Sequence, residues 1–147
     1  MDYKARSKGV SRLYAHLVLT PKYRRKVITS AMLKRLEEIT GDLCRKWQCE
    51  LMEFGREPDH IHIVFRFFPQ IQLIKFVNNL KSVTSRRIRE EFPTEVNAAY
   101  WGKKVFWTEA YSLDSCGDAP LDVLRRYVQN QKGCGAASAA SSRTQQP

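Results

Sequence analysis

Strict alternation of residues that point to opposite sides marks two short segments of the chain and constrains its fold more than any other feature. In HIHIVFRF, residues 60–67, the apolar side chains of Ile61, Ile63 and Phe65 all point to one side of an extended chain. RLYAHLVLT, residues 12–20, alternates in the same way. A period of two is typical of a strand with one buried face. Both segments are therefore predicted to be strands that pack one face against a core.

Helical spacing of apolar residues appears between these strands and after them. Ser30 can cap a helix that buries a stripe including Leu36 and Leu43, and a longer helix that buries Leu80 is closed by Pro93. Pro120 suits the first turn of a last helix. The predicted order is strand 12–20, helix 30–47, strand 49–57, strand 60–67, helix 71–91, strand 104–113 and helix 120–132.

This order predicts an α+β fold, the ferredoxin-like split βαβ sandwich, with a C-terminal helix added. It has one four-stranded antiparallel sheet with helices on one face, and its first and third strands are central neighbours. His60 and His62 then point to the face without helices, and His16 is expected on that face one strand away.

Length and composition indicate one domain, residues 1–132, followed by a tail, residues 133–147, that has almost nothing to bury. The tail is predicted to be disordered. No apolar run is long enough to cross a membrane, and the N-terminus does not read as an export signal, so a cytoplasmic protein is expected. The four cysteines lack zinc-knuckle spacing and are predicted to be free thiols without a role.

The net charge of +10 lies almost wholly outside the tail, which holds one Arg and no acidic residue. The positive residues gather in clusters, at 22–26, 85–89, 103–104 and 125–126. A domain this basic usually meets a polyanion, and nucleic acid is the commonest. General solubility is the alternative, although it would scatter the charge.

Two histidines on one strand face can hold a divalent cation between their rings. His60 and His62 fit this arrangement, but a pair of ligands leaves open the alternative of polar strand surface. His16 either lines the site or is strand surface, and it is left out of the predicted ligand set. A catalytic metal site would need a third ligand for the cation and a nucleophile.

The last predicted helix offers both groups, because Tyr127 and Gln131 lie one turn apart on the same face. The phenol oxygen of Tyr127 is a possible nucleophile, and the amide oxygen of Gln131 a possible ligand for a hard cation. From the helix alone, the alternative is that Tyr127 lies at the edge of the helix's apolar face and that Gln131 faces solvent. Near a cation, however, a phenolate is favoured and could attack a DNA phosphodiester. The covalent phosphotyrosine keeps the bond energy, so a second hydroxyl can reseal a strand.

These features together resemble the single-tyrosine HUH transposases of small bacterial insertion sequences, the TnpA type, and their REP-associated relatives. The resemblance covers roughly residues 10–132. The segments that carry it are HLVLTPKYRRKV (16–27), PDHIHIVF (58–65), KSVTSRRIREEFP (81–93), WGKKVFWTEAYSL (101–113) and LRRYVQNQ (124–131).

The resemblance implies a DNA transposase, a metal-dependent single-strand endonuclease and strand transferase. His60, His62 and Gln131 would bind Mg²⁺ or Mn²⁺, and Tyr127 would form a 5′-phosphotyrosine link and leave a 3′-hydroxyl. The substrate would be single-stranded DNA with hairpin-bearing ends, and the protein a homodimer in which the tyrosine helix can complete the partner's site.

Two groups of polar residues are candidates for DNA binding. The alternative for each residue is a solvated side chain on the surface with no role in binding. The first lies in the basic loop and the second on the outer face of the helix at 71–91, and together they are Lys22, Arg24, Arg25, Asn79, Ser82 and Arg86. Two other functions stay open: a replication initiator or relaxase of the same chemistry, and a ferredoxin-like nucleic-acid-binding module without catalysis.

Overall fold

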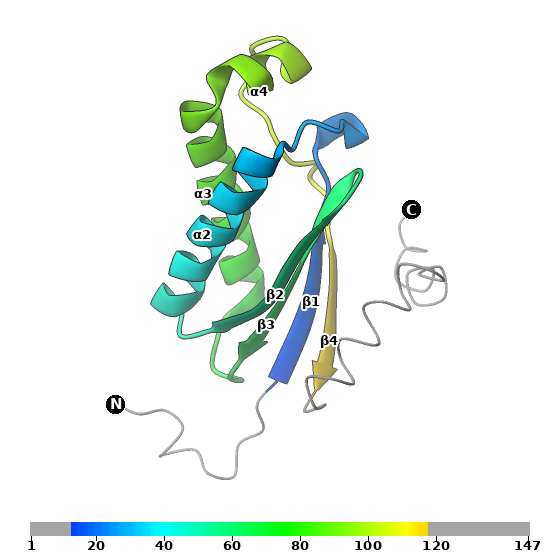
Figure 1. The fold of residues 1–147 in the computed structure, drawn as a ribbon. Helices are drawn as coiled ribbons and strands as arrows, with labels where there is room; N and C mark the ends of the chain where they lie inside the picture. Colours follow the sequence, from blue (N-terminus) through cyan, green and yellow to red (C-terminus); the bar gives the residue numbers. More distant parts are fainter. Residues whose placement is uncertain (1–12, 118–147) are drawn as a thin grey trace.

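The computed structural model describes residues 13–117, in which one antiparallel sheet forms one layer and the helices form another (Figure 1). The four strands are β1 (Leu13–Leu19), β2 (Glu50–Glu57), β3 (His60–Phe67) and β4 (Ser112–Gly117), in the order β2-β3-β1-β4. β1 and β3 are the central neighbours and pair antiparallel. The predicted fold class and the adjacency of the first and third strands are confirmed.

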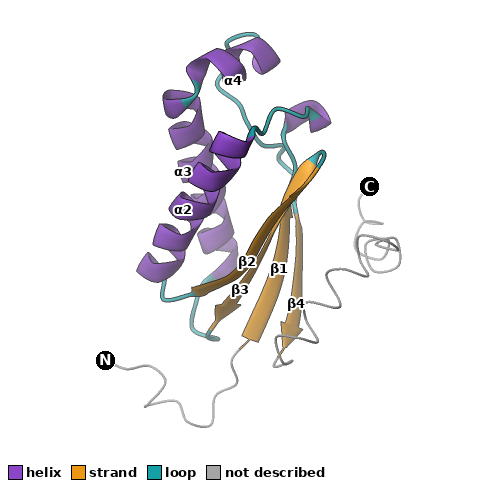
Figure 2. Ribbon diagram, viewed as in Figure 1, coloured by secondary structure: helices purple, strands orange, loops and turns teal. Residues whose placement is uncertain are grey.

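The helices lie together on one side of the sheet (Figure 2). They are α2 (Ser30–Lys46), α3 (Leu73–Glu91) and α4 (Pro93–Tyr100), and a short 3-10 turn, η1 (Lys22–Arg24), follows β1. The N-cap of α2 is Thr29 rather than the expected Ser30, because the Thr29 hydroxyl accepts a hydrogen bond of 3.1 Å from the Met32 amide.

The core fills the space between the sheet and α2 and α3. Strand residues with odd numbers supply one wall, and Leu17, Ile63 and Phe65 are fully buried. Leu36 of α2 and Leu80 of α3 supply the opposite wall. Because strand side chains alternate between faces, packing these odd positions turns the even positions of β1 and β3 to the other side. This packing is what places the histidines.

The fourth predicted strand was wrong in its position. The strand was expected at residues 104–113, but β4 begins only at Ser112. Phe106 and Trp107 are adjacent and both buried, whereas a strand with one buried face would expose one of them. Trp107 instead donates a hydrogen bond of 2.9 Å from Nε1 to Thr84 Oγ1 in α3. The apolar content of this segment therefore packs under a helix and does not form a strand.

A helix forms where a loop was expected after Pro93. Pro93 occupies the first turn of α4, where its missing amide hydrogen costs nothing, and Val96 and Tyr100 are buried on one side. Trp101 ends the helix in the left-handed conformation at φ 55°. Within residues 13–117, no helix has both the length and the apolar character needed to span a bilayer. Cys44 and Cys49 are free thiols, as predicted for these two residues, and the structure also buries both.

Candidate functional site

Three histidines gather on the face of the sheet that α2 and α3 do not cover. His62 of β3 pairs with Val18 of β1, two residues from His16, and the His16 and His62 ring centroids lie 6.0 Å apart at 73°. His60 follows two residues away on the same face of β3. The predicted juxtaposition of the histidines is therefore present.

The ring of His60 is oriented by the residue that precedes it. Nδ1 lies 3.0 Å from Asp59 Oδ1. Because a carboxylate only accepts hydrogen bonds, Nδ1 carries a proton, and in the neutral ring Nε2 is then the nitrogen with the lone pair. The hydrogen bond from His60, followed by that from Arg24, holds the pKa of Asp59 below its usual range against the opposing effect of burial. Asp59 is therefore ionised at neutral pH and fixes the tautomer of His60.

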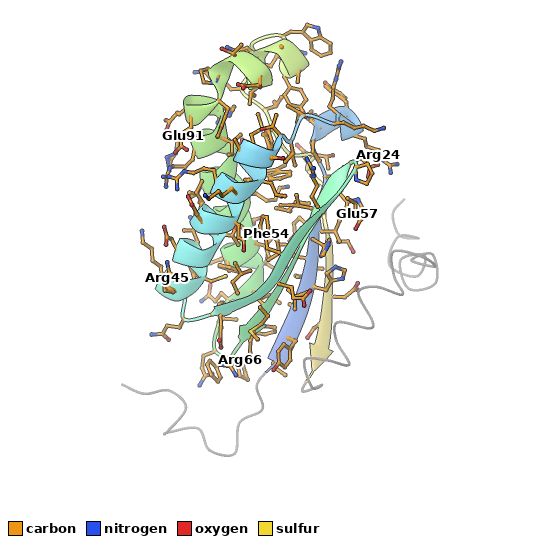
Figure 3. The ribbon with its side chains drawn as sticks, viewed as in Figure 1. Arg24, Arg45, Phe54, Glu57, Arg66 and Glu91 are labelled. Carbon is orange, nitrogen blue, oxygen red and sulfur yellow. The ribbon has the colours of Figure 1, made fainter. Side chains whose placement is uncertain are left out.

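Arg24 ties this carboxylate to the basic loop. Its Nε and Nη2 donate hydrogen bonds of 3.1 and 2.7 Å to Asp59 Oδ2. Figure 3 shows Arg24 at the end of the β2–β3 hairpin where Glu57 also lies. Glu57 sits opposite His60 in the ladder. The turn between β2 and β3 is thus a point where cationic, anionic and imidazole groups meet.

The ring of His62 occupies space that only glycine leaves open. Gly55 lies directly opposite His62 on β2. A Cβ on residue 55 would come within 2.7 Å of His62 Nε2 and 2.9 Å of Cε1, which is closer than real Cβ contacts allow. Glycine inside a strand often marks a close approach of another group. Here that group is the imidazole of a predicted metal ligand.

His16 is the most buried of the three imidazoles, with 4% of its surface exposed. Burial, then the neighbouring charges of His62 and His60, lowers the pKa of His16 to about 4. The ring is therefore neutral at physiological pH. It supplies a polar but uncharged wall beside His62, and Asp114 of β4 lies opposite it.

The described residues do not form a metal site by themselves. No group of three His, Cys, Asp or Glu side chains within residues 13–117 is arranged to hold a metal ion. The fixed tautomer of His60 and the space made for His62 nevertheless fit a cation held by imidazole nitrogen. Tyr127 and Gln131 lie outside the described residues, as does the whole predicted helix 120–132 and the tail.

The first set of DNA-binding candidates lies in and beside η1. Lys22 is partly buried, while Arg24 and Arg25 are exposed. Arg24 is engaged with Asp59, and the guanidinium of Arg25 lies 4.8 Å from the ring centre of Trp101. All three remain candidates for phosphate contacts.

The second set lies in the helical layer, on the other side of the sheet from the histidines. Ser82 and Arg86 are exposed on α3, and Asn79 accepts a hydrogen bond of 3.3 Å from Trp47 Nε1. A hollow of about 610 Å³ opens between α2 and α3. Its lining residues are Ile39, Asp42, Leu43, Arg45, Lys46, Trp47, Asn79, Val83, Arg86 and Arg87. The basic side chains around this hollow suit an anionic ligand, at a distance from the histidine cluster.

Comparison with known proteins gives the family. Residues 9–131 match the family described as "Transposase IS200 like". The chain belongs to the IS200-like transposase family.

The relatives of this IS200-like transposase agree with that assignment. The ISDra2 transposase TnpA of Deinococcus radiodurans is 25% identical over 122 residues, 83% of this chain and 86% of that protein. The transposase for insertion sequence element IS200 of Salmonella typhimurium is 26% identical over 116 residues, 79% of this chain and 74% of the relative. The chain is therefore a transposase of insertion-sequence type, and its family is one of DNA-cleaving enzymes.

Solved structures share the fold of this IS200-like transposase. A crystal structure of a Deinococcus radiodurans R1 protein assigned as a transposase matches with a TM-score of 0.66 at 27% identity, covering 83% of this chain and 92% of that one. A REP-associated tyrosine transposase bound to a REP hairpin matches with a TM-score of 0.51 at 12% identity, covering 77% and 61%. At that identity the second likeness concerns the fold alone.

Sequence reasoning missed three features of this transposase. Asp59 was given no role at the site, although its place beside a histidine was a signal for a hydrogen-bonded pair. Gly55 was passed over, although a glycine inside a strand is a positional signal. The exposed rings of Tyr23 and Trp101 are in contact although they are 78 positions apart in the sequence, and no local sequence pattern predicts that contact.

Proposed function

We propose that this transposase cleaves and rejoins single-stranded DNA through a 5′-phosphotyrosine on Tyr127, assisted by Mg²⁺ or Mn²⁺ bound by His60, His62 and Gln131. The observation that carries the proposal is the pair of imidazoles on one strand face, one held in a set tautomer by Asp59 and the other seated over Gly55. Membership of the transposase family supports the proposal, because that family consists of DNA-cleaving enzymes.

The cleavage step exchanges one phosphoester bond for another. The Tyr127 oxygen forms a bond to the phosphorus, the bond from phosphorus to the 3′-oxygen breaks, and the proton lost by the phenol is balanced by one gained by the 3′-oxygen. A bound divalent ion would favour the phenolate and withdraw charge from the phosphate. Attack on the phosphotyrosine by another 3′-hydroxyl reverses the step and joins the strands, with no external energy source.

Two groups of residues in the described part of the chain support this proposal. Asp59 keeps the proton on His60 Nδ1 and so leaves Nε2 available. The basic loop neutralises phosphates that flank the cleaved bond. We extend the proposal to DNA with hairpin-bearing ends and to a homodimer, supported by the hairpin seen with the REP-associated structural relative and by the family resemblance.

The deciding experiment follows a covalent adduct between protein and DNA. A hairpin oligonucleotide carrying single-stranded flanks is labelled at its 3′ end and incubated with the protein and Mn²⁺, then resolved on a denaturing gel. Wild-type protein is expected to shift the label, because the downstream fragment stays linked to Tyr127 through its 5′-phosphate. A 5′-labelled copy should release a fragment that a polymerase can extend. Chelation of the metal should abolish both products.

Matched variants separate the role of Tyr127 from that of other phenols. Tyr127→Phe should form no adduct, whereas Tyr14→Phe should retain it, although Tyr14 lies on the same face of β1 as His16. His60→Ala should still bind the hairpin and fail to cleave it. An adduct that persists in Tyr127→Phe overturns the assignment of the nucleophile, and binding that falls together with cleavage in His60→Ala overturns the assignment of the ligand. A binding module without catalysis would give no adduct with any variant.

A further inference from the structure

Two aromatic side chains stand out in solvent at the end of the molecule where η1 and α4 meet. Tyr23 is 58% exposed and Trp101 65% exposed, and Ile74 is the other large apolar side chain exposed to this degree within residues 13–117. The ring centroids of Tyr23 and Trp101 lie 6.3 Å apart and tilted by 56°. The rings therefore form one surface built from two distant parts of the sequence, and Ile74 is a lone side chain elsewhere.

Cations surround this pair of rings. The guanidinium of Arg25 lies 4.8 Å from the centre of the Trp101 ring, and Lys103 Nζ lies 5.9 Å from the same ring. Lys22 Nζ lies 5.9 Å from the centre of the Tyr23 ring. We call the set of Tyr23, Trp101, Lys22, Arg25 and Lys103 the aromatic platform. Its mixture of exposed ring faces and positive charge matches the two parts of a nucleotide, the base and the phosphate.

The backbone holds both rings in conformations that bulky residues seldom adopt. Tyr23 has φ 60° and Trp101 has φ 55°, in the left-handed region where glycine is the usual choice. Trp101 stands at the end of α4, a position at which helices favour glycine. Residues held in such conformations concentrate at ligand clamps and active sites. An aromatic residue at a position suited to glycine points to a use for its ring.

Buried contacts beneath the platform keep it in place. Tyr100 is fully buried, its ring centroid lies 6.3 Å from that of Tyr23, and its hydroxyl donates a hydrogen bond of 3.0 Å to the Lys22 carbonyl. The Lys22 amide donates in turn to the Phe106 carbonyl at 2.7 Å. Burial raises the pKa of Tyr100 to about 12, so its hydroxyl remains a donor at neutral pH. The platform is preformed and need not be ordered by a ligand.

The platform also connects to the histidine cluster. Arg24 lies between Tyr23 and Arg25 in the chain and donates two hydrogen bonds to Asp59, which binds His60. A DNA strand with one base on the platform would therefore lie beside Arg24, which is connected through Asp59 to His60, a proposed metal ligand.

We propose that the aromatic platform binds an unpaired nucleobase of the single-stranded DNA by stacking on Trp101 and Tyr23, with Arg25, Lys103 and Lys22 neutralising the neighbouring phosphates. The inference rests on the proposed function, since it names how the same substrate is held next to the site. A protein partner fits the platform less well, because lysine is depleted at the centres of protein interfaces and the segments 22–26 and 101–104 hold four lysines.

The test compares two probes that carry the same phosphates. One is a single strand of thymidines and the other is a strand of equal length whose internal nucleotides are abasic, both at one fixed salt concentration. Wild-type protein should bind the thymidine strand about tenfold more tightly or better, because stacking on an aromatic ring contributes to each base held. Quenching of tryptophan fluorescence should accompany that binding and be weak with the abasic strand.

Variants of the platform should lose the preference for bases and keep the affinity for phosphates. Trp101→Gly is the sharpest, because glycine suits the left-handed conformation at this position and the fold should not suffer. Tyr23→Ala should act in the same direction, and Trp101→Phe should retain part of the preference. Ile74→Ala removes an exposed apolar side chain of similar exposure and should change nothing.

The outcomes distinguish the platform from the proposed cleavage. Equal binding of the two strands by wild type, or an unchanged preference in Trp101→Gly, overturns the platform. If a Tyr127 adduct forms in that case, the proposed function stands without it. If the preference is present and no adduct forms with any DNA, the platform stands and the proposed chemistry fails. A change of sedimentation mass in Trp101→Gly without loss of base preference would make this surface a contact between copies and overturn the inference.

Discussion

His60 Nδ1 lies 3.0 Å from Asp59 Oδ1, so the histidine that leads β3 is oriented by the residue immediately before it. Two further hydrogen bonds from Arg24 hold the other carboxylate oxygen. A partner of this kind fixes the tautomer of a metal-binding histidine and raises its affinity as a ligand. The sequence order Asp-His would therefore supply both the proposed ligand, His60, and the residue that orients it.

Asp59→Ala should weaken binding of Mn²⁺ by about 10- to 100-fold, because His60 loses the acceptor that fixes its proton on Nδ1. Electron paramagnetic resonance of the free ion measures that affinity without need of activity. Asp59→Asn, which keeps an acceptor oxygen, should lose less. Asp42→Ala is the matched control, since Asp42 is also an aspartate paired with an arginine, Arg45, but lies in α2. Unchanged Mn²⁺ affinity in Asp59→Ala would show that Asp59 does not support the ligand.

Gly55→Ala should impair cleavage by displacing the ring of His62. The added Cβ would lie 2.7 Å from Nε2, and crowding of this kind costs about 1–3 kcal/mol or moves the side chain. We expect the rate of adduct formation to fall about tenfold or more, and the imidazole signals of His62 in a ¹H–¹⁵N spectrum to shift.

Gly41→Ala provides the control for Gly55. Gly41 lies inside α2, and a Cβ there would meet Leu51 and Arg45 at ordinary distances of 3.8 and 3.9 Å. Gly41→Ala should raise the free energy of unfolding by about 0.5–1 kcal/mol and leave the rate of DNA cleavage unchanged. Full activity and unshifted His62 signals in Gly55→Ala would contradict the role given to the glycine.

Much of the fold could be predicted because it depends on short periodic patterns. The alternation of residues in β3 predicted the strand and also the face on which His60 and His62 lie. Because Ile61 and Ile63 pack into the core, the two histidines must point to the opposite face of the sheet. The adjacency of β1 and β3 follows from the order of the elements, and it brought His16 beside His62 as expected.

The errors arose where tertiary packing decides the outcome. The apolar residues at 104–111 suited a strand, but Phe106 and Trp107 are both buried, and Trp107 is held by Thr84 of α3. The distance in sequence between these two partners hides the contact from any local pattern. The same limit applies to Gly55 and His62, which meet only through strand pairing. The roles of Tyr127 and Gln131 stay predictions.

Thr84→Val should destabilise the fold although the two side chains have nearly the same shape. The hydroxyl of Thr84 accepts a hydrogen bond of 2.9 Å from Trp107 Nε1, and it donates one of 2.7 Å to the Leu80 carbonyl. Valine would leave the buried indole N–H without its acceptor, which costs about 1–3 kcal/mol. Urea unfolding measures the loss.

Two comparisons isolate that hydrogen bond. Thr40 is equally buried, and its hydroxyl has no hydrogen-bond partner among residues 13–117, so Thr40→Val should be neutral or stabilising. In the background of Trp107→Phe, which removes the donor, Thr84→Val should cost less than in wild type. Equal costs in the two backgrounds would mean that the bond contributes nothing.

The ion pair between Arg35 of α2 and Glu91 of α3 should make the free energy of unfolding depend on pH in the acidic range. Arg35 donates two hydrogen bonds, of 2.7 and 3.2 Å, to the two oxygens of Glu91, and these hold the pKa of Glu91 below its usual range. A carboxyl whose pKa is lowered by folding adds stability above its unfolded pKa and loses it as the pH falls through the folded value. Both side chains are partly exposed, so the contribution is about 0.5 kcal/mol. Between about pH 6 and pH 3, the free energy of unfolding should therefore fall less in Glu91→Gln than in wild type. Glu90→Gln, an exposed neighbour, should follow wild type, and identical curves for all three proteins would count against the pair.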